Sequence, residues 1–358
     1  MTDLWHLVAM KNLSKQLPLR TEYIVCPRCA ANDRIGIHSH DERRYICHHC
    51  GKTFAETVST PFYHLKYPMA IVVLVLTLLA HGCPIAAIVA AFSIDERTVA
   101  DWHKKAGKHG QRVQSDLVCN GQVELGQVQL DELCINAQGF KAWVATGMTV
   151  FSRLFLWGEV SLHRNKSLIE RVVQKVHAAA SGLQPVVFAV DGFAAYPNAI
   201  RKFFHTKLRT GQVGRPRHVL WPDLHIVQVV KQHSGYHLTG IQRRIAHGCR
   251  QRADELIAAA QIGLGLINTA YIERLNATFR ARMPALVRRT RCPARTTQRL
   301  TTELFWTGVV YNFCTVHDSL DTTPTVAADL TDHVWSVEEL LRYYGPVKKL
   351  HEKLHDIL

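Results

Sequence analysis

The chain has 358 residues, of which 47% are hydrophobic, so it is long and apolar enough to bury the cores of two or three domains. Lys and Arg outnumber Asp and Glu by 43 to 29, which gives a formal net charge of +14 before any of the 21 histidines is protonated. This excess of positive charge predicts an anionic partner, and nucleic acid more readily than a membrane surface.

The apolar and cysteine-containing segments argue against a membrane-spanning or exported protein. The most apolar run, residues 69–80, is too short to span a bilayer and is typical of a buried helix. Residues 1–20 lack the apolar core and small-residue cleavage site of a signal peptide. Four of the ten cysteines fall in two C-x-x-C units and the rest are scattered, which favours a reducing cytoplasm over a disulfide framework.

The two C-x-x-C units lie within residues 22–56, where they predict a zinc ribbon. The unit of Cys26 and Cys29 and the unit of Cys47 and Cys50 can wrap four thiolates around one tetrahedral Zn²⁺. A redox dithiol is the alternative, but two such units this close together favour a metal. Because four protein ligands leave no open coordination position, we expect this zinc to be structural.

Three helices are predicted within residues 66–107, in an arrangement typical of a helix-turn-helix domain. In the third helix, Val99 and Trp102 are expected to face inward. The residues expected to face outward, toward a DNA major groove, are Arg97, Thr98, His103, Lys104 and Lys105. The alternative is an ordinary three-helix bundle with a solvated basic face. Residues 108–121 are polar and basic with glycines near the ends, so we predict a linker there.

From residue 122 the hydrophobic period changes to two, which predicts a meander of three antiparallel strands over residues 122–162. Alternating apolar residues in the first of these strands lead to Asp131 and Glu132. Because side chains alternate along a strand, Glu132 is expected on the opposite face from Asp131 and is not expected to bind metal.

The second half of this region alternates helices and strands. An amphipathic helix is predicted at residues 167–180, and the apolar strand at 185–190 that follows delivers Asp191 at its carboxyl end. A short helix and a further strand at residues 225–230 come next. Glu273 then lies on a helix, beside an apolar stripe with the helical period.

Short motifs surround the three acids, and a further motif lies near the end of the chain. They are Gln129-Leu130-Asp131-Glu132, Ala189-Val190-Asp191-Gly192, Asn268-Thr269-Ala270-Tyr271-Ile272-Glu273-Arg274-Leu275-Asn276 and Tyr311-Asn312-Phe313-Cys314. In this order, and on strand, strand and helix, they resemble the DDE-class transposases of bacterial insertion sequences, most closely insertion sequence family one and its relatives. With the zinc ribbon and helix-turn-helix in front, the resemblance covers most of residues 20–340.

The resemblance implies a ribonuclease H-like catalytic core, an α/β fold with a mixed five-stranded sheet and helices. It also implies that Asp131, Asp191 and Glu273 are the catalytic acids and that they bind Mg²⁺ or Mn²⁺, hard ions that prefer carboxylate oxygens. The basic residues expected to contact DNA near this site are Arg280, which matches a basic position of the family, and Arg288 and Arg289.

One departure from the family concerns the spacing of the acids. The interval between Asp191 and Glu273 is longer than in retroviral integrases or in family one itself. We interpret residues 233–268 as a basic helical insertion before the final helix. That insertion leaves Asp254 or Glu255 as an alternative third acid.

The predicted organisation indicates a DNA transposase, which is expected to bind the terminal inverted repeats of its element and to join them to target DNA. The protein is expected in the cytoplasm, associated with the bacterial nucleoid, as a homodimer or higher oligomer with no membrane partner. The alternatives are another two-metal nuclease or integrase of the same fold and a non-catalytic, zinc-dependent DNA-binding regulator. The expected parts are an N-terminal segment (1–21), zinc ribbon (22–56), helix-turn-helix (66–107), linker (108–121), core (122–330) and C-terminal tail (331–358).

Overall fold

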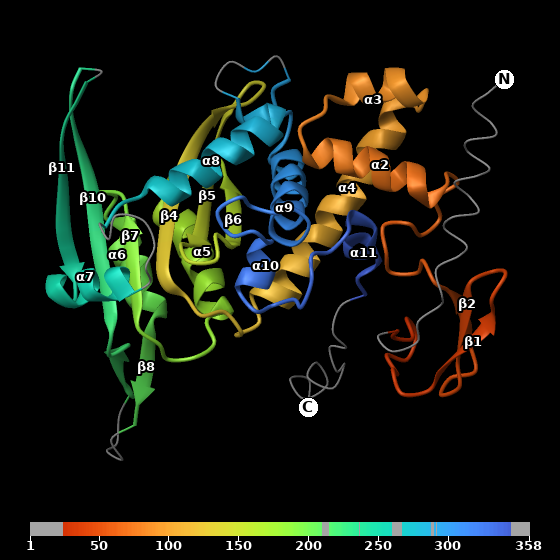
Figure 1. The fold of residues 1–358 in the computed structure, drawn as a ribbon, viewed down its shortest axis with the longest axis horizontal. Helices are drawn as coiled ribbons and strands as arrows, with labels where there is room; N and C mark the ends of the chain where they lie inside the picture. Colours follow the sequence, from red (N-terminus) through yellow and green to blue (C-terminus); the bar gives the residue numbers. More distant parts are fainter. Residues whose placement is uncertain are drawn as a thin grey trace.

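A computed structural model describes residues 24–209, 215–235, 237–259, 267–287, 290 and 292–344. The predicted N-terminal segment, residues 1–21, lies outside the described residues, as does the end of the predicted tail, residues 345–358. Figure 1 shows the small N-terminal sheet at one end of the molecule, a group of helices in the middle and the large sheet at the other end. No helix in the described part is long and apolar enough to cross a bilayer.

The N-terminal unit is a three-stranded antiparallel sheet in the order β1-β2-β3. Its strands are β1 (Ile35–Ser39), β2 (Arg44–Cys47) and β3 (Thr53–Ala55). Tyr45 and Phe54 pair across β2 and β3 with ring centroids 5.7 Å apart, and with Ile24 they form a small apolar cluster. So small a core buries little apolar surface, which fits a unit that depends on a metal for stability.

Three helices follow, as predicted: α2 (Met69–Ala80), α3 (Ile85–Phe92) and α4 (Glu96–Val113). Ser93 adopts a left-handed conformation at the C-terminus of α3, with φ of 51°, which reverses the chain toward α4. Asp95 caps α4 because its side chain accepts hydrogen bonds from the backbone N–H groups of Arg97 and Thr98.

The predicted linker over residues 108–121 is wrong, because α4 continues to Val113 and a π-helical turn, η1 (Gln114–Val118), follows it. Gly107, just before this segment, and Gly110, near its start, serve helix packing. A Cβ at Gly107 would lie 2.5 Å from the Thr302 side chain, and one at Gly110 would lie 3.0 Å from a backbone oxygen of Phe305. α4 therefore packs closely against α9 (Thr297–Phe313).

The large sheet is mixed and has six strands in the order β11-β10-β7-β4-β5-β6. The predicted antiparallel meander is confirmed for β4, β5 and β6, and β7 pairs in parallel with both β4 and β10. The strands are β4 (Gly126–Asn136), β5 (Lys141–Thr149), β6 (Phe155–Ser161), β7 (Val186–Val190), β10 (Leu224–Ser234) and β11 (His237–His247).

The sixth strand, β11, corrects two predictions: a five-stranded sheet and a basic helical insertion over residues 233–268. β10 and β11 form a long antiparallel hairpin in which Ser234 pairs with His237. Within the described residues, only α7 (Arg250–Ala259) is helical in this segment. The two adjacent arginines of β11, Arg243 and Arg244, obscured the strand pattern, because they occupy both of its faces at the edge of the sheet.

Helices cover both faces of the sheet. One face packs against α5 (Lys166–Ala179) and α6 (Ala195–Phe203). The other packs against α7 and α8 (Ala270–Arg282). The remaining described elements are the β8 (His205–Leu208) and β9 (Arg217–Leu220) pair, the 3₁₀ turn η2 (Pro284–Leu286), α10 (Pro324–Ala327) and α11 (Val337–Arg342).

The helix α9 joins the three-helix unit to the sheet. The indole N–H of Trp306 donates to the backbone oxygen of Leu76 in α2 at 2.8 Å. Farther along α9, the Asn312 side chain accepts from the backbone N–H of Phe155 in β6 and donates to its carbonyl oxygen. One buried apolar cluster accordingly runs from α2 through α4 and α9 to the sheet.

Candidate metal centre and acidic site

The four cysteines of the small sheet converge on one point. Sγ of Cys26 lies 3.6 Å from Sγ of Cys50, and Sγ of Cys29 lies 3.5 Å from Sγ of Cys47. All four sulfur atoms lie within 4.8 Å of one another. Tetrahedral Zn²⁺ with Zn–S bonds of about 2.3 Å requires sulfur atoms about 3.8 Å apart, so the four residues can hold a structural zinc.

The backbone closes both cysteine units in the same way. The N–H of Ala30 donates to the carbonyl oxygen of Cys26 at 2.9 Å, and the N–H of Gly51 donates to that of Cys47 at 2.8 Å. Both donors are left-handed, with φ of 58° at Ala30 and 69° at Gly51. Burial disfavours the Cys26 thiolate, but hydrogen bonds from backbone N–H groups outweigh burial and lower the pKa of that thiol to about 7.

Sheet register brings Asp131 and Asp191 to neighbouring strand positions. In the parallel pairing of β4 with β7, Gln129 is opposite Ala189. Asp131 and Asp191 each follow two residues later, at the carboxyl edge where β7 ends. In-register residues on parallel strands lie side by side, so the two acids are adjacent at this edge of the sheet.

The helix α8 crosses β4 and brings Glu273 toward these acids. The Gln129 side chain accepts from the backbone N–H of Ile272 at 2.9 Å and donates to the carbonyl oxygen of Asn268 at 2.7 Å. The Asn276 side-chain amide donates to Oδ2 of Asp131 at 2.8 Å. Glu273 is one helical turn before Asn276, so its Cβ lies about 5–6 Å from that of Asn276.

The orientation of the Asn276 amide is set by a third strand. The hydroxyl of Thr146, which is paired with Asp131 across β4 and β5, donates to Oδ1 of Asn276 at 3.0 Å. With Oδ1 engaged, Nδ2 faces Asp131. Burial, followed by the charges of Glu132 and Asp191, raises the pKa of Asp131 to about 6. Clustered, partly buried carboxylates of this kind are typical of sites that bind cations.

Two cations pair with the acids at this edge. Arg164, just before α5, contacts both Glu132 and Asp191, and its guanidinium lies 3.1 Å from Oδ2 of Asp191. Lys231 of β10 forms an ion pair with Glu273, which also accepts from the Thr269 hydroxyl at 2.8 Å. These contacts offset the negative charge of the clustered carboxylates.

Glu132 points to the opposite face of β4 from Asp131, as expected. Its carboxylate accepts from the Tyr196 hydroxyl in α6, whereas Asp131 faces α8. The Glu132 side chain is 2% exposed, and burial raises its pKa. Glu132 therefore ties Arg164 and α6 to the edge of the sheet.

The carboxylates of Asp131, Asp191 and Glu273 are more widely separated than the sulfur atoms of the cysteine site. Among the described residues, only the four cysteines form a group of three or more His, Cys, Asp or Glu residues whose ligand atoms all lie within 4.8 Å. The alternative third acids pair with arginines of their own helix: Asp254 with Arg250 at 2.7 Å and Glu255 with Arg252 at 3.4 Å.

Four residues at this edge were not predicted as part of the site: Gln129, Arg164, Lys231 and Asn276. Gln129 and Asn276 fall inside the motifs around Asp131 and Glu273, so those motifs already contained a signal for them. Arg164 and Lys231 come from a loop and from a strand whose register is not readable from the sequence. Only the folded sheet brings these two cations to the acids.

The predicted DNA-facing residues of α4 separate into two groups. Arg97 and Lys104 are exposed and Thr98 and Lys105 are partly exposed, with Lys105 paired to Asp101 at 2.9 Å. His103 is buried, so its prediction as a DNA-facing residue is wrong. It follows Val99 by one turn and lies on the face of α4 that packs inward.

The remaining predicted DNA contacts lie near the end of α8. Arg280 is partly exposed in the last turn of α8. Arg288 and Arg289 lie outside the described residues.

A scan against models of protein families found no match to this chain, and a search of curated proteins found no similar sequence.

Proposed function

We propose that the chain is a DNA transposase with a ribonuclease H-like core, in which Asp131, Asp191 and Glu273 hold Mg²⁺ or Mn²⁺. The observation that carries this proposal is that Asp131 and Asp191 each come two residues after Gln129 and Ala189, the last paired positions of the parallel strands β4 and β7, with α8 fixed to Asp131 through Asn276. The strand order β6-β5-β4-β7-β10, with β11 added at the edge, is the order expected for that fold.

The residues of the site have distinct tasks in this proposal. Divalent ions bound to the three carboxylates supply activation of water, or of a DNA 3′ hydroxyl, and of the phosphodiester under attack. Asn276 and Thr146 orient the Asp131 carboxylate, and Gln129 holds the start of α8 against β4. Arg164 and Lys231 stand where DNA phosphates must approach, and they balance the acids before metal and DNA bind.

The N-terminal half supports the same proposal. Arg97 and Lys104 give the exposed face of α4 positive charge, and the ribbon adds further basic residues to one end of the molecule. Contacts from such residues to phosphates supply affinity without sequence information. DNA bound by α4 would be held relative to the acids, because α4 packs directly on α9.

A nicking assay on supercoiled plasmid in Mg²⁺ or Mn²⁺ tests the proposal. We expect wild type to nick, and Asp131→Asn, Asp191→Asn and Glu273→Gln each to abolish nicking. Glu255→Gln is the matched control, since it changes an acid of α7 that is paired within its own helix, and it should nick like wild type. Nicking that survives Glu273→Gln but not Glu255→Gln would show that Glu255, and not Glu273, is the third acid.

A non-catalytic, zinc-dependent DNA-binding regulator is the second candidate. It is favoured by one observation: among the described residues, the cysteines alone form a compact metal-ligand group. Wild-type protein that binds DNA but nicks plasmid with neither Mg²⁺ nor Mn²⁺ would support the regulator and contradict the transposase.

A further inference from the structure

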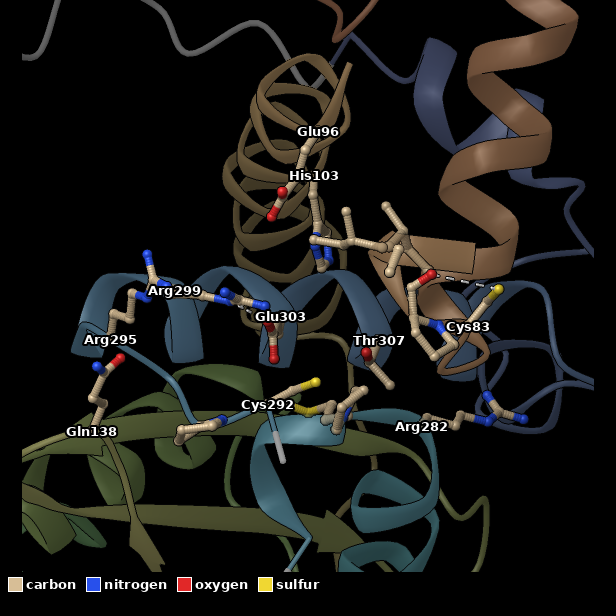
Figure 2. Close-up of a pocket in the computed structure, with 17 residues that line it drawn as sticks. Cys83, Glu96, His103, Gln138, Arg282, Cys292, Arg295, Arg299, Glu303 and Thr307 are labelled. Atoms are coloured by element: carbon tan, nitrogen blue, oxygen red, sulfur yellow. Dashed lines mark hydrogen bonds and ion pairs between the residues drawn. The ribbon is translucent and has the colours of Figure 1, made fainter. Parts of the chain in front are cut away.

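A cleft of about 570 Å³ lies where α3 and α4 meet the end of α8 and the first half of α9 (Figure 2). Its volume falls within the roughly 300–1,000 Å³ typical of small-molecule sites. None of the three candidate catalytic acids lines it. It is therefore a separate feature, at the junction between the three-helix unit and the sheet.

Two buried polar side chains from facing helices enter this cleft. Figure 2 shows His103 reaching down from α4 and the Glu303 carboxylate projecting from α9. His103 is 9% exposed and Glu303 is 5% exposed. Nε2 of His103 and Oε2 of Glu303 have no hydrogen-bond partner among the described residues. Buried polar groups without partners are unfavourable, so a polar ligand in the cleft would gain hydrogen bonds at both positions.

The charge states of the two groups define what that ligand must offer. Burial, and to a smaller extent the charge of Arg299, lowers the pKa of His103 to about 4, so its ring is neutral at pH 7. Oε1 of Glu303 accepts from Arg299 at 2.8 Å. Burial raises the pKa of Glu303, but the hydrogen bond and charge of Arg299 oppose this shift and favour the carboxylate. In that form Oε2 accepts from an N–H or O–H donor, and the neutral imidazole of His103 supplies a second polar group.

The rim of the cleft combines cations with apolar surface. Arg282, Arg295 and Arg299 line it together with one exposed acid, Glu96, and guanidinium groups bind phosphate in a bidentate manner. The apolar lining comes mainly from Pro84, Ile85, Met283, Pro284 and Pro293. A flat apolar ring that carries amino donors and is attached to phosphates matches all of these features at once, and this is the chemistry of a nucleotide.

The position of the cleft relates it to the acidic site. Glu273 is in the first turn of α8, and Arg282 at the last residue of that helix lines the cleft. The rise of 1.5 Å per residue separates the two positions by about 14 Å. At about 3.4 Å per nucleotide, a strand that follows α8 takes about four steps from the acids to the cleft.

We propose that the cleft receives one unpaired DNA nucleotide, whose base donates an exocyclic amino hydrogen to Glu303 and whose phosphates lie against the arginines of the rim. This inference rests on the proposed DNA-processing function and deepens it, because it names a second place where the DNA strand is held. Adenine, cytosine and guanine carry the required amino group, whereas thymine and an abasic sugar do not.

Binding of full-length, zinc-loaded protein to fluorescein-labelled duplexes with one central bulged position tests the inference. Fluorescence anisotropy would compare bulged dA, dC, dG, dT and an abasic sugar. We expect the amino-bearing bases to bind about tenfold more tightly than the abasic bulge and more tightly than dT, because only they satisfy Glu303. Equal affinity for dA, dT and abasic bulges in the wild-type protein would overturn the inference without any variant.

Glu303→Gln sharpens the test, because it replaces the acceptor that faces the base by a group that can donate. The preference for amino-bearing bases should fall to near unity, while affinity for the fully paired duplex stays unchanged. Glu338→Gln is the matched control, since Glu338 also pairs with an arginine four residues along its helix, on α11. A preference that persists in Glu303→Gln would contradict the assignment of Glu303.

Failure of this inference can be distinguished from failure of the proposed function. Plasmid nicking without base preference would leave the transposase proposal standing and remove the cleft from it. Base preference without nicking would leave a nucleotide-binding cleft in a protein that does not cut DNA.

Discussion

The cysteine site and the acidic site are assembled in opposite ways. Each C-x-x-C unit is closed by a backbone hydrogen bond within itself, so the zinc ligands are arranged locally and only two segments must meet. The acids come from two strands and a helix, and every one of them is held by a different partner: Asn276, Arg164 or Lys231. A local site can be recognised from spacing, whereas a dispersed site depends on register and helix docking.

Zinc removal should give the largest effect, and it should affect the cysteine site and leave the acidic site unchanged. Structural zinc contributes about 10–16 kcal/mol to small zinc units, so we expect chelation to unfold the ribbon over residues 24–56. The sheet should stay folded, because its core is separate from the ribbon cluster. Hydrogen exchange of both regions would check this. Two outcomes would contradict the local character of the cysteine site. In one, chelation leaves the protection of β1 and β2 unchanged; in the other, β4 and β7 lose protection to the same extent as β1 and β2.

Asp131→Asn should produce the next largest effect, in the dispersed site. The pKa of Asp131 is raised from 3.8 to about 6, so the native state binds this proton more tightly than the unfolded state and loses stability as pH rises between these values. We expect the metal-free variant to be more stable than wild type at pH 7, by on the order of 2–3 kcal/mol, with little difference near pH 4. Urea unfolding at both pH values measures the change.

Divalent metal provides the control for that experiment. Added Mg²⁺ should stabilise wild type at pH 7 and should stabilise Asp131→Asn little, because the amide cannot replace a carboxylate ligand. A pH-independent difference between the two proteins would show that Asp131 lacks the raised pKa.

Lys231→Met should show a smaller effect, on metal binding rather than on folding. The Lys231 and Glu273 side chains are 38% and 45% exposed, so loss of the pair should change unfolding free energy by less than about 1 kcal/mol. Removing the competing cation should tighten Mg²⁺ binding several-fold, as measured by calorimetry. Lys202→Met, which breaks an ion pair with Glu170 on α5, is the control. Identical Mg²⁺ affinity in both variants would exclude competition by Lys231.

The smallest predicted effect distinguishes the two cysteine units from each other. Ala30 has φ of 58°, so Ala30→Gly should stabilise the zinc-loaded ribbon by about 0.5–1 kcal/mol. Gly51→Ala should destabilise it by a similar amount through backbone strain alone, because a Cβ there meets nothing within 4 Å. Thermal melting of the ribbon checks both. Destabilisation by Ala30→Gly together with stabilisation by Gly51→Ala would show that the left-handed turns do not limit the stability of the site.

The sequence was sufficient wherever a pattern is local. Paired cysteines, the inward positions of Val99 and Trp102, and an apolar strand that ends just before Asp191 are all found in the structure. The predicted strand end at Asp131 is wrong, because β4 continues past Asp131 to Asn136. Alternation also assigned Glu132 to the face opposite Asp131, because side-chain direction along a strand follows from spacing alone.

The sequence was insufficient where a residue owes its role to a distant helix. His103 was expected to face DNA and Gly110 to lie in a linker, yet both lie on the face of α4 that meets α9, where the missing Cβ of Gly110 lets the backbones approach. β11 was mistaken for helix because an edge strand needs no clear apolar face. Arg164 and Lys231 carry no local signal of their tasks, since their partners are brought near only by the folded sheet.

The uninterrupted course of α4 makes it a rigid strut between the exposed lysine and arginine positions and the body of the molecule. The number of residues in α4 therefore fixes how its outer half is rotated relative to the body of the molecule. Each residue added between Lys105 and Gly107 would turn the outer half by about 100° and advance it by 1.5 Å. In the proposed function, a duplex bound by that half would change direction, so the length of this one helix would set the angle at which DNA approaches the sheet.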